Sequence, residues 1–514
     1  MSINHAKRVW LVAAENGALR GGKVGGIADV IRDLPLALVD SGWQVSVIIP
    51  AYDRFNQLAE TEYITGIKVG FGGNTHIAEL SRLQGPSLQI EYLFIEHPII
   101  SSVGAGVIYY DDGPDKPFET DATRFAFFSA AVAACVEQAA VPPDVLHLHD
   151  WHTGLVPALR DFEPSFEQLR SVRTVYTIHN LAIQGIRPLR DHASSLQSWF
   201  PHLAYKYEQL ADPRYSDCVN PMAAAIRLAD KLNTVSPAYA AEILQSNDPQ
   251  LGFSGGEGLE ADLRVAARQG RLTGILNGCP YPAPGGRRPG WSRLLDTIAT
   301  EQQLFEGNAP ARQTLKTLSR RRPATVLVSI GRISGQKTTL FLEPTDTHDS
   351  ALEAILESQG KKIVFIMLGS GDGALEKRLI NIAESHSNFL YLRGYSEPLP
   401  DLLYLAGDLF LMPSSFEPCG ISQMLAMRSG QPCVVHAVGG LKDTVTNGVD
   451  GFAFGGKNPR EQAQNFAANV NRALSMRESD REQWNSICKN AAARRFDWRS
   501  ATDRYISELY EVED

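Results

Sequence analysis

The feature that most constrains the fold of this sequence is a series of short, continuous apolar runs with helical stretches between them. Runs in which apolar residues follow one another, instead of alternating with polar ones, are typical of parallel strands buried on both faces by helices. In the first half they lie at 9–14, 45–49, 92–95, 145–148, 175–178, 232–235 and 275–276. In the second half they lie at 326–330, 363–368, 389–392, 409–412 and 434–435. The pattern predicts an α/β protein with two doubly wound parallel-sheet lobes.

A Pro- and Gly-rich stretch separates the two series of runs. Residues 280–289 read PYPAPGGRRP, and the sequence has no strand signal from there through Arg320–Pro323. Such composition is typical of a connection between domains. We therefore expect a first lobe over 1–285, a linker over 286–323 and a second lobe over 324–490. The last segment, 491–514, has apolar residues at helical spacing and is predicted to be a docking helix.

Charge and cysteine usage exclude several classes of protein. The chain has 49 basic and 58 acidic residues, a net charge of −9, which gives no general attraction to nucleic acid or anionic lipid. Six widely spaced cysteines form no C-x-x-C pair, so we expect neither a disulfide framework nor a zinc cluster, and a reducing cytoplasm fits best. The longest apolar stretch, 125–136, is well short of the ~18 residues that a membrane helix needs.

A glycine-rich loop follows the first predicted strand. It reads GGKVGGIAD from Gly21 to Asp29 and leads into a helix with an apolar face. Glycines allow the backbone to approach a ligand closely, and the lysine is a cation suited to phosphate. The spacing fits neither a P-loop nor the dinucleotide-binding fingerprint. A flexible turn with a solvated Lys23 is the alternative interpretation.

Histidines follow the next two predicted strands. His149-Asp150-Trp151-His152 comes after the run at 145–148, and His179-Asn180 comes after the run at 175–178. On a strand His147 and His149 share one face, whereas His152 falls in the turn, and no carboxylate-plus-histidine set accompanies them. We therefore predict no metal site and interpret the group as the hydrogen-bonded wall of a binding site, with a structural histidine as the alternative for His179.

The second half carries its cations and a carboxylate at strand ends. Arg332 and Lys337 lie in the turn after the run at 326–330, where two cations can hold a diphosphate and neutralise a departing phosphate. Glu417 follows the run at 409–412 and could accept hydrogen bonds from sugar hydroxyls, or simply favour a helix N-terminus. Glycines at 439 and 440 introduce a third helix.

Taken together and in this order, these motifs resemble the bacterial glycogen synthase and starch synthase family. The segments that carry the resemblance are KVGGIADV (23–30), HLHDWHTG (147–154), TIHNLAIQG (177–185), TVSPAYAAEI (234–243), GILNG (274–278), GRISGQK (331–337), PSSFEPCGISQMLAMRSG (413–430) and VGGLKDTV (438–445). They span most of the chain. The resemblance implies a GT-B glycosyltransferase with two Rossmann-like lobes, a cleft between them and a terminal helix that crosses back to the first lobe.

The resemblance also implies an activity: retaining, metal-independent transfer of glucose from ADP-glucose, or UDP-glucose, to the non-reducing end of an α-1,4-glucan. No cofactor beyond the nucleotide sugar is expected. The residues implied in catalysis are Lys23, His179, Arg332, Lys337 and Glu417. Donor binding is implied for Gly25, Gly26, Asp29, Asn277, Tyr395, Cys419, Gly420, Gly440 and Thr444. Asp150, Trp151 and Asn180 are implied on the acceptor side.

The sequence departs from the family's usual pattern in several places, as a divergent member would. The departures are Val24, Thr338, Ser415, His436 and the segment Cys279–Pro282. They keep the cations expected to grip phosphate but alter positions expected near the acceptor. Two alternatives follow: the same chemistry with a small, non-glucan acceptor, and a catalytically silent glucan-binding protein.

Overall fold

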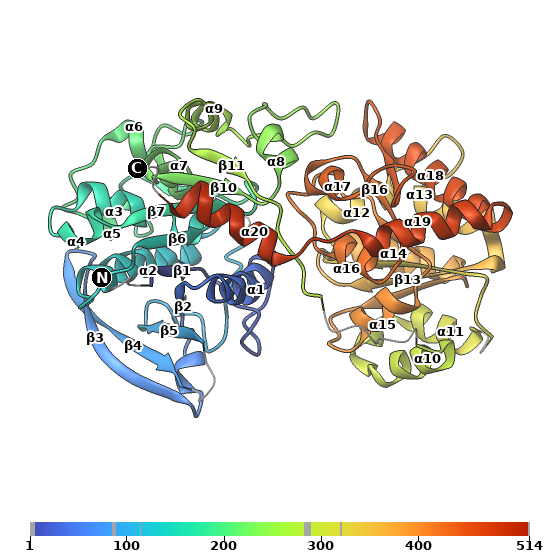
Figure 1. Ribbon diagram of the computed structural model, residues 1–514, viewed down its shortest axis with the longest axis horizontal. Coiled ribbons are helices and arrows are strands. Elements are labelled where there is room, and N and C mark those ends of the chain that lie inside the picture. Colours follow the sequence, from blue (N-terminus) through green and yellow to red (C-terminus); the bar gives the residue numbers. More distant parts are fainter. Residues whose placement is uncertain (1–5, 85–88, 114, 282–288, 319–320, 512–514) are drawn as a thin grey trace, which may run out of the picture. The chain divides into compact units, whose positions relative to one another are not determined.

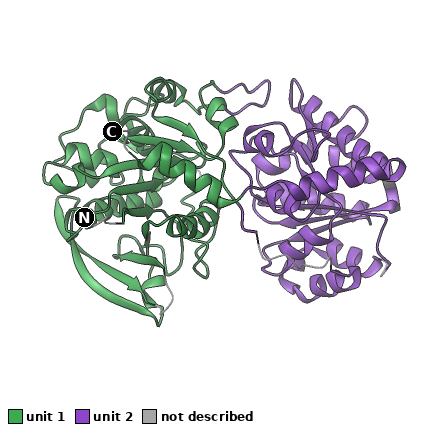
Figure 2. Cartoon of the chain, in the orientation of Figure 1, with its two compact units in different colours: residues 1–246, 255–278, 497–514 green, residues 247–254, 279–496 purple. Residues whose placement is uncertain are grey.

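The chain forms two compact units (Figure 2). The computed structural model describes residues 6–84, 89–113, 115–281, 289–318 and 321–511. Unit 1 consists of 1–246, 255–278 and 497–514, and unit 2 consists of 247–254 and 279–496. Residues 247–254 therefore belong to unit 2 although the sequence on both sides of them belongs to unit 1.

Unit 1 is built, within its described residues, on a sheet of nine strands (Figure 1). In order across the sheet these are β11 (Leu272–Gly274), β10 (Lys231–Thr234), β7 (Arg173–Ile178), β6 (Val145–His149), β1 (Arg8–Val12), β2 (Gln44–Pro50), β5 (Ile90–Glu96), β4 (Asn74–Leu83) and β3 (Thr61–Phe71). From β11 to β5 all neighbours are parallel, whereas β4 runs antiparallel to both β5 and β3. A short antiparallel pair, β8 (Arg187–Pro188) and β9 (Cys218–Val219), lies apart from this sheet.

Helices enclose the sheet of unit 1. They are α1 (Gly26–Asp40), α2 (Glu119–Glu137), α3 (Val156–Phe162), α4 (Glu167–Arg170), α5 (Leu196–Trp199), α6 (Tyr207–Leu210), α7 (Pro221–Leu228), α8 (Pro237–Glu242), α9 (Glu260–Arg268) and α20 (Trp498–Arg504). Helix α1 buries Ile27, Val30, Ile31 and Leu34, the spacing that places apolar side chains on one helical face. That face explains why the glycine loop ends in a helix.

The C-terminal segment docks onto unit 1, where Figure 1 shows α20 in red among elements from the first half of the chain. The helix continues as a π-helical turn, Tyr505–Tyr510. Arg504 donates to the carbonyl of Gly274 at 3.1 Å, and Asn233 of β10 donates to the hydroxyl of Tyr505 at 2.9 Å. The segment therefore contacts residues more than 200 positions earlier in the sequence.

Unit 2 contains a fully parallel sheet of six strands in the part that the structure describes. Their order is β14 (Phe389–Arg393), β13 (Ile363–Gly369), β12 (Thr325–Ile330), β15 (Leu409–Met412), β16 (Cys433–His436) and β17 (Phe452–Phe454). The helices are α10 (Trp291–Thr300), α11 (Ala309–Thr317), α12 (Gly335–Leu342), α13 (Ala351–Gln359), α14 (Gly373–Ser385), α15 (Leu399–Ala406), α16 (Ser422–Arg428), α17 (Gly439–Thr444), α18 (Pro459–Ser479) and α19 (Arg481–Ala493).

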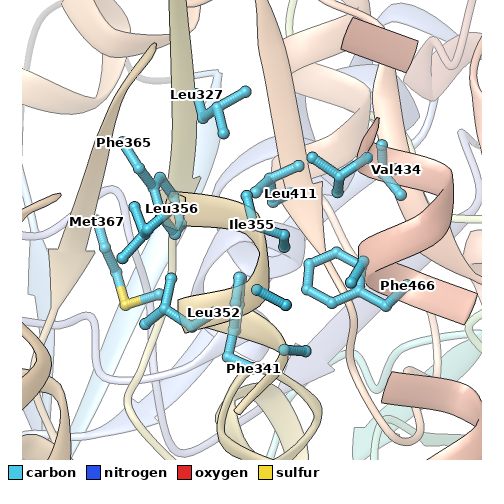
Figure 3. Close-up of a cluster of buried hydrophobic side chains, with 14 of the residues drawn as sticks. Leu327, Phe341, Leu352, Ile355, Leu356, Phe365, Met367, Leu411, Val434 and Phe466 are labelled. Carbon is cyan, nitrogen blue, oxygen red and sulfur yellow. The ribbon is translucent and has the colours of Figure 1, made fainter. Parts of the chain in front are cut away.

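A buried apolar cluster holds one face of this sheet to its helices (Figure 3). Phe365 and Met367 of β13 pack with Phe341 of α12, Ile355 of α13 and Phe466 of α18. Phe341 and Phe466 meet edge to face, with ring centroids 5.3 Å apart. The continuous apolar run at 363–368 is thus buried, as expected for a strand covered by helices. No helix in the described ranges is long and apolar enough to cross a membrane.

The predicted two-unit α/β architecture with doubly wound parallel sheets is confirmed, and three details differ from the sequence prediction. The antiparallel ribbon β3–β4 carries a largely exposed strand and gave no continuous apolar run. The run at 275–276 lies just beyond β11 rather than in it.

The third difference concerns the stretch 286–323, which was expected to be a linker. Residues 286–288 and 319–320 lie outside the described residues. Much of the rest is helical and belongs to unit 2. Helix α10 buries Trp291, Leu294, Leu295 and Ile298, a helical spacing that the Pro- and Gly-rich stretch before it obscured.

The strand order defines one topological switch point in each sheet. In unit 1 the neighbours of β1 are β2 on one side and β6 on the other, and in unit 2 the neighbours of β12 are β13 and β15. Ligands of open parallel sheets bind beyond the carboxyl ends of the strands at such points. A ligand-binding site is therefore expected at the loops after β1 and β6 in unit 1 and after β12 and β15 in unit 2.

Candidate functional site

In the loop after β1, a buried carboxylate accepts hydrogen bonds from the backbone of the glycine-rich turn. Glu15, which is 2% exposed, accepts hydrogen bonds from the backbone N–H groups of Val24 at 2.7 Å and Gly25 at 2.5 Å. Its other oxygen accepts from the hydroxyl of Tyr109 at 2.6 Å. The Gly25 amide, predicted to face the phosphates of a donor, is thus already engaged by the protein. The carboxylate fixes the shape of the loop.

Lys23 is held beside the start of α1 by an ion pair. Its ammonium lies 2.7 Å from Asp29, whose carboxylate also accepts from Arg32 at 3.0 Å. The Lys23 side chain remains 45% exposed, so solvent screening makes this pair weak. Lys23, Gly26 and Asp29 therefore lie together at the N-terminal end of α1, where the helix dipole and free N–H groups favour an anion.

Asp150 supports the backbone at the next strand end. Its Oδ1 accepts from the backbone N–H of His179 at 2.7 Å, which joins the turn after β6 to the turn after β7. The residue has φ 54° and ψ −177°, a region that residues other than glycine rarely occupy, at a cost of about 1–3 kcal/mol. Burial raises the pKa of Asp150 to about 8, against the backbone N–H groups of His179 and Asn180, which lower it. The strained backbone of Asp150 thus places its carboxyl group where it holds the chain at His179.

The histidines after β6 and β7 form one buried group. His149 Nδ1 lies 2.9 Å from Nε2 of His179, and His147 bonds the hydroxyls of Thr177 and Tyr510 at 2.7 Å each. Burial lowers the pKa of His147 and of His179 to about 3 and that of His149 well below its usual value. These imidazoles are therefore neutral at physiological pH, and they offer directed hydrogen bonds rather than charge.

Trp151 is a packing residue of the same turn. Its ring is 5% exposed and meets Phe125 edge to face with centroids 5.3 Å apart. A Cβ atom at Gly185, which has φ +69°, would lie 2.2 Å from the indole, so only glycine fits there. Any contact of Trp151 with an acceptor is confined to a small part of the ring.

Two amide side chains complete the unit 1 set. Asn277, just after β11, is 4% exposed, and its Oδ1 accepts no hydrogen bond from any described residue. An unpaired buried acceptor is costly unless a ligand satisfies it. Asn180 instead uses its Oδ1 to accept from the backbone of Ala182 at 2.9 Å, which shapes the turn after β7.

In unit 2, the loops after β12 and β15 bring Lys337 and Glu417 together. Lys337 Nζ lies 2.5 Å from Glu417 Oε2, which also accepts from the hydroxyl of Ser414 at 3.0 Å. Both protein donors use Oε2, and Oε1 accepts from none of the residues that the structure describes. Glu417 is 6% exposed and Lys337 is partly buried. The pair presents one free carboxylate oxygen beside a cation.

Arg332 lies at the same strand end and differs from Lys337 in exposure and in pairing. Its side chain is exposed, and within the described ranges it makes no hydrogen bond or ion pair with the protein. A guanidinium at a sheet switch point without an internal partner retains all its donors for an external anion. Arg332 and Lys337 thus form a cationic set next to Glu417.

The turn after β16 packs closely on the segment that follows Glu417. The N–H of Gly440 donates to the carbonyl of Glu417 at 3.0 Å, and a Cβ at Gly440 would lie 2.3 Å from the carbonyl oxygen of Cys419. Gln423 donates to the carbonyls of Cys419 and Gly420 and to Thr444 Oγ1, at 3.0 to 3.2 Å. Four predicted donor-binding positions are therefore locked to one another. Tyr395, which is 72% exposed, projects from the loop after β14.

Among the positions that depart from the family's pattern, Val24 is exposed, and the other described ones have ordinary packing or hydrogen-bonding roles in this chain. Thr338 is 2% exposed and continues α12 after Lys337. Ser415 donates from both its backbone and its hydroxyl to the carbonyl of Gln336, at 2.8 and 3.1 Å. His436 lies 3.0 Å from the carbonyl of Ser414 and stacks on Phe454. Within Cys279–Pro282, Pro282 lies outside the described residues, and Tyr281 accepts from the backbone of Phe496 at 2.9 Å.

Sequence reasoning missed residues that support the predicted ones. Glu15 and Ser414 were not selected, although each lies at a strand end beside a selected motif, and that position was the available signal. Tyr109 had none, because it reaches Glu15 from a loop 94 residues away. The roles of the selected residues toward a substrate stay predictions. Among the described residues, no group of three or more His, Cys, Asp or Glu side chains is arranged to hold a metal ion.

Comparison with protein families matches both units. Residues 8–265 match the family described as the starch synthase catalytic domain, and residues 323–491 match the family described as glycosyl transferases group 1.

Individual proteins and structures align over nearly the full length. A glycogen synthase from Streptococcus equi subsp. equi (strain 4047) is 32% identical over 98% of this chain and 99% of its own length. One from Anaeromyxobacter dehalogenans (strain 2CP-C) is 33% identical over 94% and 95%. The structure of the catalytic domain of starch synthase IV from Arabidopsis thaliana, bound to ADP and acarbose, is similar with a TM-score of 0.77 and 27% identity, covering 98% of each chain. Sucrose-phosphate synthase from Thermosynechococcus elongatus shares the fold, with a TM-score of 0.56 and 18% identity.

Proposed function

Since the chain belongs to the glycogen synthase and starch synthase family, has the GT-B fold and is a glycosyltransferase that transfers glucose to a glucan, we propose that its donor is ADP-glucose. UDP-glucose is the second choice. Two findings support the proposal: the similar starch synthase IV catalytic domain is bound to ADP, and unit 2 of this chain carries the cationic set.

The observation that carries the proposal is the contrast between Arg332 and the Lys337–Glu417 pair. Arg332 is exposed and has no internal partner in the described residues, so an anionic ligand would not have to displace a protein carboxylate from it. Lys337 is oriented by Glu417 at 2.5 Å. Two cations with these properties fit the two phosphates of a nucleoside diphosphate, and the free Oε1 of Glu417 fits a sugar hydroxyl.

The proposed reaction retains the configuration of the glucosyl carbon. A hydroxyl oxygen of the glucan bonds to the anomeric carbon as the bond from that carbon to the diphosphate oxygen breaks. The hydroxyl proton passes to an oxygen of the departing diphosphate, so that nucleoside diphosphate leaves. Arg332 and Lys337 stabilise the negative charge that develops on this leaving group. No enzymic nucleophile is assigned.

We propose that unit 1 serves the same reaction through Lys23, Asp29, His179 and Asn277, with Asp150, Trp151 and Asn180 on the acceptor side. His179 would contact the reacting sugar with its neutral ring, and its backbone carbonyl would face the positive charge that develops at the anomeric carbon. Asp150 supports this role because it holds the backbone N–H of His179 at 2.7 Å. Lys23 and the N-terminus of α1 at Gly26 would favour the phosphates, whereas the Gly25 N–H is held by Glu15.

A product assay tests the donor and acceptor together. The protein is incubated with ADP-glucose, UDP-glucose or GDP-linked sugars, with either glycogen or a panel of small acceptors. We expect growth of glycogen chains with ADP-glucose as the best donor. Exclusive formation of a small glycoside, or turnover only with a GDP-linked sugar, would contradict the proposal.

The proposed reaction needs no metal ion, and a reducing cytoplasm is the proposed location. The six cysteines are all free thiols in the structure, which fits that compartment. Activity should persist after treatment with EDTA and desalting. A strict requirement for an added divalent cation would overturn the metal-independent mechanism.

A further inference from the structure

His149 and His179 are joined by a hydrogen bond whose direction decides what His179 can offer a substrate. The two nitrogens, His149 Nδ1 and His179 Nε2, lie 2.9 Å apart, and both rings are buried. A bond between two imidazoles requires one N–H and one lone pair. In each neutral ring, the other nitrogen has the opposite protonation state. The direction of this one bond therefore sets the protonation of all four ring nitrogens.

The outer nitrogens have different surroundings. His149 Nε2 is buried and has no partner in the part of the chain that the structure describes. His179 Nδ1 also has no described hydrogen-bond partner, but it is not among the buried atoms that lack one, which leaves it open to solvent or a ligand. Of these two nitrogens, only Nδ1 of His179 can form a hydrogen bond with solvent or a ligand.

Two arrangements are possible for this pair. If His179 donates, His149 must carry a proton on Nε2, and a buried N–H is left without an acceptor. If His149 donates, only a lone pair is left there, and His179 carries its proton on Nδ1. In protein backbones, buried N–H groups without an acceptor are rarer than under-satisfied buried carbonyl groups, and we apply the same order to the two imidazole nitrogens. The second arrangement is therefore favoured.

We infer that His149 is a positioning residue that donates from Nδ1 to His179 and so fixes His179 as the Nδ1-protonated tautomer, with that N–H available to a hydroxyl oxygen of the transferred sugar. The inference rests on the proposed contact between His179 and the sugar. His149 touches no substrate in this account and acts through His179.

The surrounding residues support a fixed rather than a fluctuating pair. Burial lowers the pKa of both rings, so each ring is neutral and carries a single N–H at physiological pH. His147 lies against His149, with ring centroids 4.3 Å apart, and is itself fixed by two hydroxyl groups. Asp150 holds the His179 backbone. The His179 ring is thus restrained from both its backbone and its Nε2 side.

The direct test is the protonation state of His179 in the full-length protein. Ring nitrogens are observed by NMR in protein labelled with ¹⁵N-histidine, and the His149 and His179 signals are identified from the spectra of His149→Asn and His179→Ala. We expect wild-type His179 to be protonated on Nδ1 and His149 to be protonated on Nδ1. A His179 protonated on Nε2 would overturn the inference.

A pair of substitutions separates hydrogen bonding from packing. In His149→Asn the amide nitrogen stands as many bonds from the backbone as Nδ1 does and can donate to His179, whereas His149→Leu has no donor. We expect His149→Leu to lower kcat about 10- to 100-fold, by analogy with the loss of hydrogen-bond partners of metal-bound imidazoles, and His149→Asn to restore most of it. Equal losses in both variants, with His179 still Nδ1-protonated in His149→Leu, would refute the role of His149.

The activity of His179→Ala distinguishes this inference from the proposed function. If His179→Ala keeps full activity, the proposed sugar contact fails, and a positioning role for His149 fails with it, even where NMR confirms the direction of the hydrogen bond. If His179→Ala is impaired while wild-type His179 is protonated on Nε2, the proposed contact stands and only the inference about His149 is wrong.

Discussion

The two units differ in how the polar groups at their strand ends are buried and paired. In unit 1, apart from the exposed Lys23 and the unpaired Asn277 Oδ1, most of these polar groups are buried and bonded to the protein, as in the bond from His179 to Asp150 and the carboxylate of Glu15 inside the glycine loop. In unit 2, Arg332 is exposed and unpaired among the described residues. Unit 1 therefore uses most of its polar residues to fix backbone shape, whereas unit 2 keeps charge available for an anionic ligand.

The largest expected effect is a loss of unit 1 stability in mild acid. His147, His152 and His179 have pKa values lowered to about 3 and His149 is lowered further, because burial disfavours the charged ring. The unfolded chain binds these protons below its ordinary pKa of about 6.5, so the folded state loses stability as pH falls through that value.

Asp150 acts in the opposite direction, since its raised pKa makes the folded state bind a proton that the unfolded state releases. Four such histidines against one carboxyl give a loss of at most about 4 kcal/mol per pH unit near pH 5. Hydrogen exchange measured at pH 7, 6 and 5 and corrected for intrinsic rates should show unit 1 losing protection before unit 2. Equal losses in the two units would break the comparison.

The next effect is on catalysis in unit 2. Replacing Lys337 by Ala removes a cation that stabilises the leaving diphosphate, and kcat should fall roughly 10²–10³-fold. It also leaves the buried Glu417 without its ion pair, so the unfolding temperature of unit 2 should fall. Steady-state kinetics and calorimetry measure the two losses. Near-normal turnover would remove Lys337 from the mechanism.

Arg332→Ala should separate binding from stability more cleanly. A charge-assisted hydrogen bond contributes about 1.5–3 kcal/mol, so kcat/KM for the donor should fall about 10- to 150-fold. Because no described residue pairs with Arg332, the unfolding temperature should stay the same. Arg332→Lys is the matched control and should recover only part of the loss, since an ammonium lacks the forked geometry. A marked drop in unfolding temperature would show that Arg332 has a structural role.

The smallest effect is expected for Glu15→Gln. The amide keeps an acceptor for the glycine loop but loses the charge that strengthens the bonds to Val24 and Gly25, at a cost of about 1 kcal/mol in unit 1. Denaturant unfolding measures it. Glu60→Gln, at an exposed carboxylate of the same unit, is the control and should change nothing. A Glu15→Gln protein as stable as Glu60→Gln would mean that the loop does not depend on the charge.

Much of the fold was predictable because buried parallel strands leave a local mark. The runs at 326–330 and 363–368 correspond to β12 and β13. Helices pack on these strands through the buried cluster of Figure 3. The ribbon β3–β4 was not predictable in the same way, because an exposed strand needs no continuous apolar run. Helix α10 had a helical apolar spacing, but the Pro- and Gly-rich stretch before it suggested a linker.

The kinds of chemistry that each half carries could be inferred from the sequence, since histidines, glycines and cations at strand ends are visible as local patterns. The sequence placed Arg332 and Lys337 after one buried run and Glu417 after another, and the carboxyl ends of parallel strands share one edge of a sheet. The pairing of those groups, in contrast, depends on the three-dimensional fold. The Glu15–Gly25 bond, the free Oε1 of Glu417 and the bond between His149 and His179 depend on distances between residues that are not neighbours in sequence. Hydrogen bonding acts over about 3 Å, so only the folded chain specifies which group is satisfied and which is left for a ligand.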